Sequence, residues 1–94
     1  MNPVSQTDKV GRIRTDLESL MGERMRLKAN MGRSKIVERE GTLEATHPSL
    51  FIVKVEEKRE RTARVSYSYV DVLTGTVELI HPESEESLLP WLLN

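Results

Sequence analysis

The stretch "ERMRLKAN", residues 23–30, decides the fold, because the spacing of apolar residues changes here from a helical to a strand-like period. Met25, Leu27 and Ala29 alternate with charged or polar residues, which is typical of a strand with one face in a core and one in water. Before this stretch, apolar residues recur every three or four positions, as they do in an α-helix. The sequence therefore predicts one N-terminal helix followed by β-structure.

The predicted helix covers residues 8–21. Its apolar side consists of Val10, Ile13, Leu17, Leu20 and Met21. Gly22 follows the last of these, where a left-handed residue commonly ends a helix. A helix this short is marginal alone, so we expect its apolar side to pack on the rest of the protein.

Four further extended segments follow the first. They cover residues 36–46, 50–56, 62–69 and 76–80. Gly41 inside the second suggests a bulge or a sharp bend, and residues 70–75 are long enough for a single 3-10 turn before the last. The expected fold is mainly β, a small five-stranded SH3-like barrel over residues 23–80 preceded by one α-helix.

The C-terminal tail, residues 81–94, is first acidic and then apolar. Its large apolar side chains are Leu88, Leu89, Trp91, Leu92 and Leu93. They are too few to cross a bilayer and too apolar to be left in water without consequence. Either they fold back onto the barrel or the helix, or they form a docking segment for a partner or for a second copy in a homodimer.

Charge is distributed unevenly along a chain of 94 residues with a net charge of only -1. Residues 1–39 hold nine Lys or Arg against five Asp or Glu, whereas residues 40–94 hold five against ten. Within the first part, strand alternation places Arg24, Arg26 and Lys28 on one face, about 7 Å apart. This spacing would allow several contacts with the phosphates of a nucleic-acid strand.

Arg24, Arg26 and Lys28 form a basic strip, which has three open interpretations. It could bind RNA or DNA, it could contact an acidic protein, or it could be a solvent-exposed face whose cations pair with Glu38, Glu40 or the acidic second half of the chain. Aromatic residues are only 4% of the chain, which leaves little for base stacking, and Tyr67 and Tyr69 share the face of Val65. The candidate contact residues are Arg24, Arg26, Lys28, Arg33, Lys35 and Arg39.

No arrangement for catalysis or metal binding is found in the sequence. There is no cysteine, and His47 and His81 are each followed by proline in a predicted turn, without ligand-type neighbours. A Gly-rich phosphate loop is also lacking, and Ser66 and Ser68 have no nearby base. We therefore expect a protein without enzymatic activity, cofactor or metal.

No apolar run approaches the ~20 residues that a membrane-spanning helix requires. The N-terminus "MNPVSQTDKVGRIR" also lacks the apolar region of a secretory signal. These patterns predict a cytoplasmic protein that does not bind membranes.

Two segments, "LKANMGRSKIVEREGTLEATHPSLFIVKV" and "RVSYSYVDVLTGTVEL", resemble the Veg family of small proteins from Gram-positive bacteria. The resemblance rests on the runs "LKAN-x-GR-x-K" and "ER-x-G" and above all on "RVSYSY-x-DVLT-x-TVEL". It covers about residues 7–80, so we expect a Veg-like domain over residues 1–80 and a separate tail over residues 81–94.

The resemblance implies a helix beside an SH3-like barrel and a cytoplasmic role without known catalysis. Members of the family are associated with stimulation of biofilm formation through altered transcription of matrix genes, by opposing a biofilm repressor. It supplies no catalytic or ligand residue. We therefore expect a regulatory protein that contacts a transcription regulator through its basic strip, with nucleic-acid binding by the face around residues 24–39 as the alternative.

Overall fold

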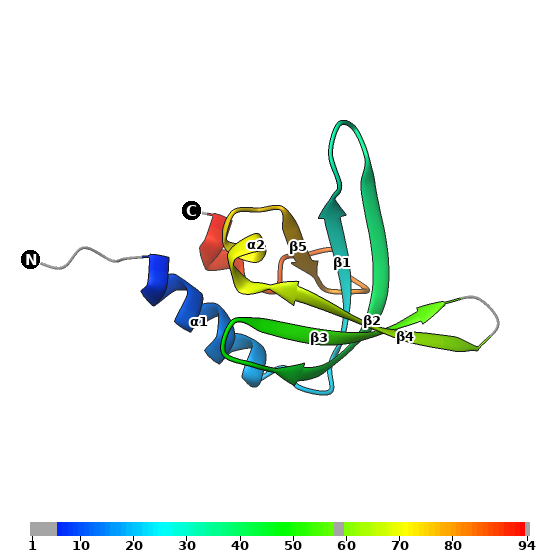
Figure 1. The fold of residues 1–94 in the computed structure, drawn as a ribbon, viewed down its shortest axis with the longest axis horizontal. Coiled ribbons are helices and arrows are strands. Elements are labelled where there is room, and N and C mark those ends of the chain that lie inside the picture. Colours follow the sequence, from blue (N-terminus) through cyan, green and yellow to red (C-terminus); the bar gives the residue numbers. More distant parts are fainter. Residues whose placement is uncertain (1–5, 58–59, 94) are drawn as a thin grey trace, which may run out of the picture.

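The computed structural model of the protein describes residues 6–57 and 60–93 of the 94-residue chain. One helix is followed by four strands, a short helix, a fifth strand and a C-terminal 3-10 turn (Figure 1). In chain order these elements are α1 (Gln6–Glu18), β1 (Arg24–Asn30), β2 (Ile36–Thr46), β3 (Leu50–Glu57), β4 (Arg61–Ser68), α2 (Tyr69–Leu73), β5 (Val77–Ile80) and η1 (Pro90–Leu93).

The five strands form one antiparallel sheet in the order β4-β3-β2-β1-β5. β1 therefore lies between β2 and the last strand, and the two ends of the sheet are β4 and β5. β3 and β4 run across the direction of β1, so that the sheet curls around one core (Figure 1). The predicted mainly β fold, with five strands after an N-terminal helix, is confirmed.

The core fills the curled side of the sheet, with α1 packed against it. The side chains with at most 1% exposure are Ile13, Leu17, Met25, Leu27, Leu43, Phe51, Val53, Val55 and Tyr69. Complete burial of a large apolar side chain contributes about 1.5–3 kcal/mol relative to exposure. Docking of Ile13 and Leu17 in this core therefore stabilises a helix that would be marginal alone.

Helix α1 begins at Gln6 and ends at Glu18, whereas the predicted helix covers residues 8–21. The α-helix ends early because the chain tightens into a 3-10 turn after Glu18. The Leu20 amide donates to the Leu17 carbonyl oxygen over 2.9 Å, which replaces the longer α-helical bond with a 3-10 bond. Gly22 then adopts a φ of 82°, the left-handed conformation that the sequence predicts for it.

Tyr69 begins a helix, whereas the sequence predicted that it ends the fourth strand. Ser68 stops β4 by accepting a hydrogen bond from the Val70 amide over 3.0 Å, and the chain enters the five-residue helix α2 in place of a single 3-10 turn. The Tyr69 ring is fully buried, and its hydroxyl donates to the His47 carbonyl oxygen over 2.7 Å. Burial of the ring with a satisfied hydroxyl stabilises this turn of the chain.

Gly41 allows β2 to pass very close to β3. It pairs with Met25 on one side and with Val55 on the other. A Cβ atom at this position would collide with the Lys54 carbonyl oxygen and lie 2.8 Å from the Val55 Cα atom. The register irregularity falls within residues 43–45, so the glycine serves the close approach and the predicted bulge lies slightly further along the strand.

Candidate interaction surface

The first three cations of the basic stretch lie on the outer face of β1. Arg24, Arg26 and Lys28 alternate with residues that point into the core. Met25 and Leu27 are the inward residues between them, with 0% and 1% exposure. The alternation predicted for this strand is therefore confirmed, and the three cations share one face of the sheet.

Acidic side chains lie directly beside two of these cations. Arg26 is opposite Glu40 on β2. Lys28 is flanked on both sides, by Glu38 on β2 and by Glu78 on β5. Opposite charges across neighbouring strands attract one another, and they lower the positive potential that an approaching phosphate would meet.

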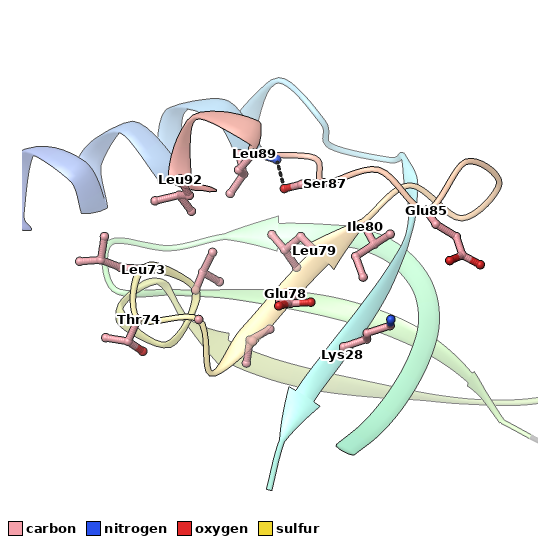
Figure 2. Close-up of a pocket in the computed structure, with 13 residues that line it drawn as sticks. Lys28, Leu73, Thr74, Glu78, Leu79, Ile80, Glu85, Ser87, Leu89 and Leu92 are labelled. Atoms are coloured by element: carbon pink, nitrogen blue, oxygen red, sulfur yellow. Dashed lines mark hydrogen bonds between the residues drawn. The ribbon is translucent and has the colours of Figure 1, made fainter. Parts of the chain in front are cut away.

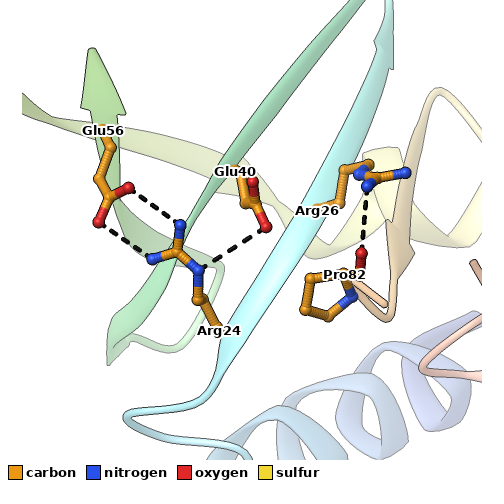
Figure 3. Close-up of polar contacts among 5 residues, drawn as sticks. All are labelled: Arg24, Arg26, Glu40, Glu56 and Pro82. Atoms are coloured by element: carbon orange, nitrogen blue, oxygen red, sulfur yellow. Dashed lines mark hydrogen bonds and ion pairs between the residues drawn. The ribbon is translucent and has the colours of Figure 1, made fainter. Parts of the chain in front are cut away.

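Arg24 is held by two carboxylates (Figure 3). Its guanidinium donates to both carboxylate oxygens of Glu56 on β3, over 3.0 and 2.9 Å, and its Nε atom lies 3.7 Å from Glu40 Oε2. The hydrogen bonds and opposite charges of this bidentate pair raise the pKa of Arg24 and lower the pKa of Glu56. The charge of Arg24 is therefore already matched within the molecule.

Arg26 holds the acidic segment that follows β5 (Figure 3). Its Nη2 atom donates to the Pro82 carbonyl oxygen over 3.1 Å, and its Nη1 atom lies 3.6 Å from Glu85 Oε2. The Arg26 side chain is only 27% exposed. Pairing with the acidic second half is one of the interpretations of the strip, but no local pattern indicates the Pro82 carbonyl oxygen, which is 56 residues from Arg26.

The hairpin tip, residues 31–36, joins β1 to β2 and projects away from the core (Figure 1). It carries Arg33 and Lys35 beside two exposed apolar side chains, Met31 with 64% and Ile36 with 62% exposure. Among the side chains that the structure describes, neither of these two cations forms an ion pair. Positive charge and apolar surface are thus both available to a partner here.

Arg39 lies on the other face of the sheet from Arg24, Arg26 and Lys28. It pairs in register with Leu27, whose side chain points into the core, so the two share the inner face. Burial raises the pKa of the Tyr67 hydroxyl, and the charge of Arg39 partly offsets this increase. The structure therefore does not bring Arg39 together with Arg26 and Lys28.

The C-terminal segment folds back along β5. The Leu88 amide donates to the Leu79 carbonyl oxygen over 2.9 Å, and Leu89 enters the core with 2% exposure. Leu88 and Leu92 also pack against the core, whereas the Leu93 side chain lies outside the described part of the chain.

Trp91 fastens the same segment to α1. Its indole Nε1 donates to Asp16 Oδ2 over 2.7 Å, and the guanidinium carbon of Arg12 lies 4.1 Å from the centre of the ring. These contacts join residues far apart in the sequence through a charge-assisted hydrogen bond and a cation-π interaction. The chain's own packing thus uses Leu88, Leu89, Trp91 and Leu92.

A pocket of about 420 Å³ lies between β5, the end of α2 and the C-terminal segment (Figure 2). Much of its wall is apolar, including Leu73, Leu79 and Leu89, and Lys28 and Glu78 also line it. Among the described residues, no group of three or more His, Cys, Asp or Glu side chains is placed to bind a metal ion.

The residues that carried the family resemblance form the centre of this architecture. The run "LKAN-x-GR-x-K", residues 27–35, supplies the end of β1 and the hairpin tip. The run "RVSYSY-x-DVLT-x-TVEL", residues 64–79, supplies most of β4, α2 and most of β5. The model of the family described as "Biofilm formation stimulator VEG" matches residues 8–80. The chain belongs to the VEG family. None of the curated proteins compared with the chain matches it.

The VEG match begins in α1 and ends at Ile80, the last residue of β5, so the C-terminal segment lies beyond it. The family is named for stimulation of biofilm formation and not for an enzymatic reaction. Neither α1 nor α2 has the length and apolar composition needed to cross a lipid bilayer.

Proposed function

We propose that this VEG-family protein is a non-enzymatic, cytoplasmic regulatory protein that stimulates biofilm formation by contacting a transcription regulator and opposing a biofilm repressor. The contact surface is the hairpin tip together with Lys28 at the adjoining end of the basic strip. The partner surface that fits this tip is apolar in its centre and acidic around it.

The choice of the hairpin tip as contact surface is supported by a contrast between its cations, which form no ion pair among the described side chains, and those at the start of β1. Arg24 and Arg26 bond to carboxylates and a carbonyl oxygen of the same molecule. The hairpin tip instead exposes Met31 and Ile36 beside positive charge. Adjacent exposed apolar side chains favour protein contact, because their removal from water stabilises a complex while the charges select the partner.

Charge reversal at the tip tests the proposal. The double variant Arg33→Glu with Lys35→Glu should lose both association with a purified biofilm repressor and stimulation of matrix-gene transcripts. The double variant Lys9→Glu with Lys54→Glu changes net charge equally at exposed positions elsewhere and should retain both. Equal melting curves confirm intact folding, and full activity of the tip variant would place the contact elsewhere.

Direct binding of RNA or DNA remains the second candidate. It is supported by Arg33 and Lys35, and by Lys28 although Glu38 and Glu78 flank it, since none of these three cations forms an ion pair among the described side chains. Neutralisation of about three phosphates predicts a log-log dependence of duplex DNA affinity on salt with a slope of about -3. Fluorescence anisotropy with DNA and RNA probes measures this slope, and absence of binding at low salt excludes the candidate.

A further inference from the structure

The two end strands of the sheet differ in what covers their outer edges. The edge of β5 is capped by the C-terminal segment: Ser87 pairs with Ile80, and the His81 amide donates to the Glu86 carbonyl oxygen over 2.8 Å. β4 pairs along all eight of its residues with β3, and no described strand lies on its other side. Within the described residues, one edge of the sheet is therefore covered by another segment and the other pairs with no strand.

The inner face of β4 is also covered less completely than that of its neighbour. Ala63, Val65 and Tyr67 are only partly buried, although they pack against the core. The β3 residues opposite them, Val55, Val53 and Phe51, are at most 1% exposed. The core thus ends in partly exposed apolar side chains along β4.

The sequence of β4, "RTARVSYS", carries few of the features that protect an exposed edge. It has no proline and no lysine, and its only charged residue on the inner face is Arg61, at its start. An edge of this length with unpaired backbone groups is a template for another strand. We propose that two copies of the chain pair antiparallel through β4 to form a symmetric dimer.

The side chains fit a pairing centred on Val65. With the two-fold axis at Val65, this residue faces the partner's Val65, and Ala63 faces the partner's Tyr67. Arg64 then faces the partner's Ser66, so no like charges are directly opposite. Each copy continues the inner face of the other, which buries the partly exposed apolar side chains of both.

Other registers are less favourable. An axis at Arg64 would place two guanidinium groups opposite each other, and like charges in that position destabilise a strand pair. An axis at Ala63 would place Arg61 against the partner's Val65 and Tyr67 against residue 59, which lies outside the described residues. The pairing centred on Val65 avoids both of these conflicts.

The mass of the chain in solution gives the first measurement. One copy has a mass of 10.8 kDa. Because a single strand pair buries little surface, we expect a weak dimer with a dissociation constant on the order of micromolar or weaker. Sedimentation equilibrium from micromolar to millimolar concentration should show the mass doubling, and a constant monomer mass over this range would overturn the proposal.

Cross-linking identifies the surface. The chain has no cysteine, so each introduced cysteine is unique. Directly opposed residues have Cβ atoms about 4.5–5.5 Å apart, close to disulfide geometry, so Val65→Cys should cross-link on mild oxidation. Ser34→Cys at the exposed hairpin tip is the control and should not. Equal cross-linking of both variants, or none at residue 65, contradicts this register.

Disruption completes the test. Val65→Lys places two ammonium groups opposite each other at the axis and should keep the protein monomeric. Thr62→Gln, an uncharged substitution on the outer face of the same strand, should leave the dimer intact. Thermal melting separates loss of folding from loss of pairing, and a folded Val65→Lys variant that still doubles in mass shows that the copies meet elsewhere.

Discussion

The two ends of the β1–β2 hairpin are built differently, although the same alternation of side chains runs through both. At the start of β1, Leu27 fills the core, while Arg24 and Arg26 bond to groups of the same molecule on the outside. At the far end, Met31 and Ile36 are mostly exposed. Positions that look equivalent in the sequence are therefore structural at one end and free to bind at the other.

The difference comes from residues that are distant in the chain. Arg24 finds Glu56, 32 residues away, and Arg26 finds Pro82, 56 residues away. The hairpin tip projects away from the strand β3 that carries Glu56 and from the segment after β5 that carries Pro82 (Figure 1). A cation in the sequence thus becomes a candidate for binding only after the fold has shown which carboxylates lie beside it.

The largest expected effect breaks the structural end of the hairpin at Gly41. In Gly41→Ala the new Cβ atom meets backbone atoms of Lys54 and Val55, which cannot move away as a flexible side chain could. We expect the free energy of unfolding to fall by about 4 kcal/mol, as in other severe steric substitutions. Urea denaturation measures this loss. Gly11→Ala, with no atom near the added Cβ, is the control and should be neutral or stabilising.

A matched pair of truncations on the same hairpin gives the next effect. Leu27→Ala removes a side chain with 1% exposure and should cost about 3 kcal/mol, because it leaves a cavity in the core. Ile36→Ala removes one with 62% exposure and should change the stability by less than about 0.5 kcal/mol. Similar losses for both variants in chemical denaturation would refute the division of the hairpin into two ends.

The strands were the most predictable part of this fold, because a period of two is a local property. The range 36–46 for β2 is recovered as predicted, and β1 differs from the predicted 23–30 by one residue. The outer face of β1 also follows directly from alternation. Local pattern therefore predicted which side chains could be displayed, though not which of them would stay unpaired.

The parts that the sequence did not settle depend on contacts between distant segments. Ser68 caps the start of α2, and the Tyr69 hydroxyl then reaches the His47 carbonyl oxygen, a contact between distant segments that propensity cannot reveal. The position of Trp91 depends on Asp16, 75 residues earlier in the chain. Arg39 separates from Lys28 because pairing register sets its face of β2.

Acid should weaken the structural end through the pair of Arg24 and Glu56. The folded pKa of Glu56 is lowered, so this pair stabilises the fold above the ordinary carboxyl pKa and loses its effect as the pH falls through the lowered value. Arg24→Gln removes this dependence. The stability difference between wild type and variant should therefore be present at pH 7 and shrink toward pH 2, in denaturation experiments at several pH values.

The effect of Arg24→Gln should be small because both side chains are largely exposed to solvent. Lys54→Gln removes an exposed cation of β3 and should show no comparable dependence on pH. A carboxyl titration of Glu56 followed by NMR gives a direct check, since its pKa should rise in Arg24→Gln. An unchanged titration would mean that the bidentate pair is not maintained in solution.

The smallest expected change in stability is at the hairpin tip, where the change in function should be greatest. Met31→Ser with Ile36→Ser removes two exposed apolar side chains and should alter stability by no more than about 0.5 kcal/mol each. Association with the repressor and stimulation of matrix genes should nevertheless fall sharply, because apolar contact is lost while the charge remains. Val70→Ser, at a 51% exposed apolar residue of α2, is the matched control. Loss of function in the control but not at the tip would move the contact to α2.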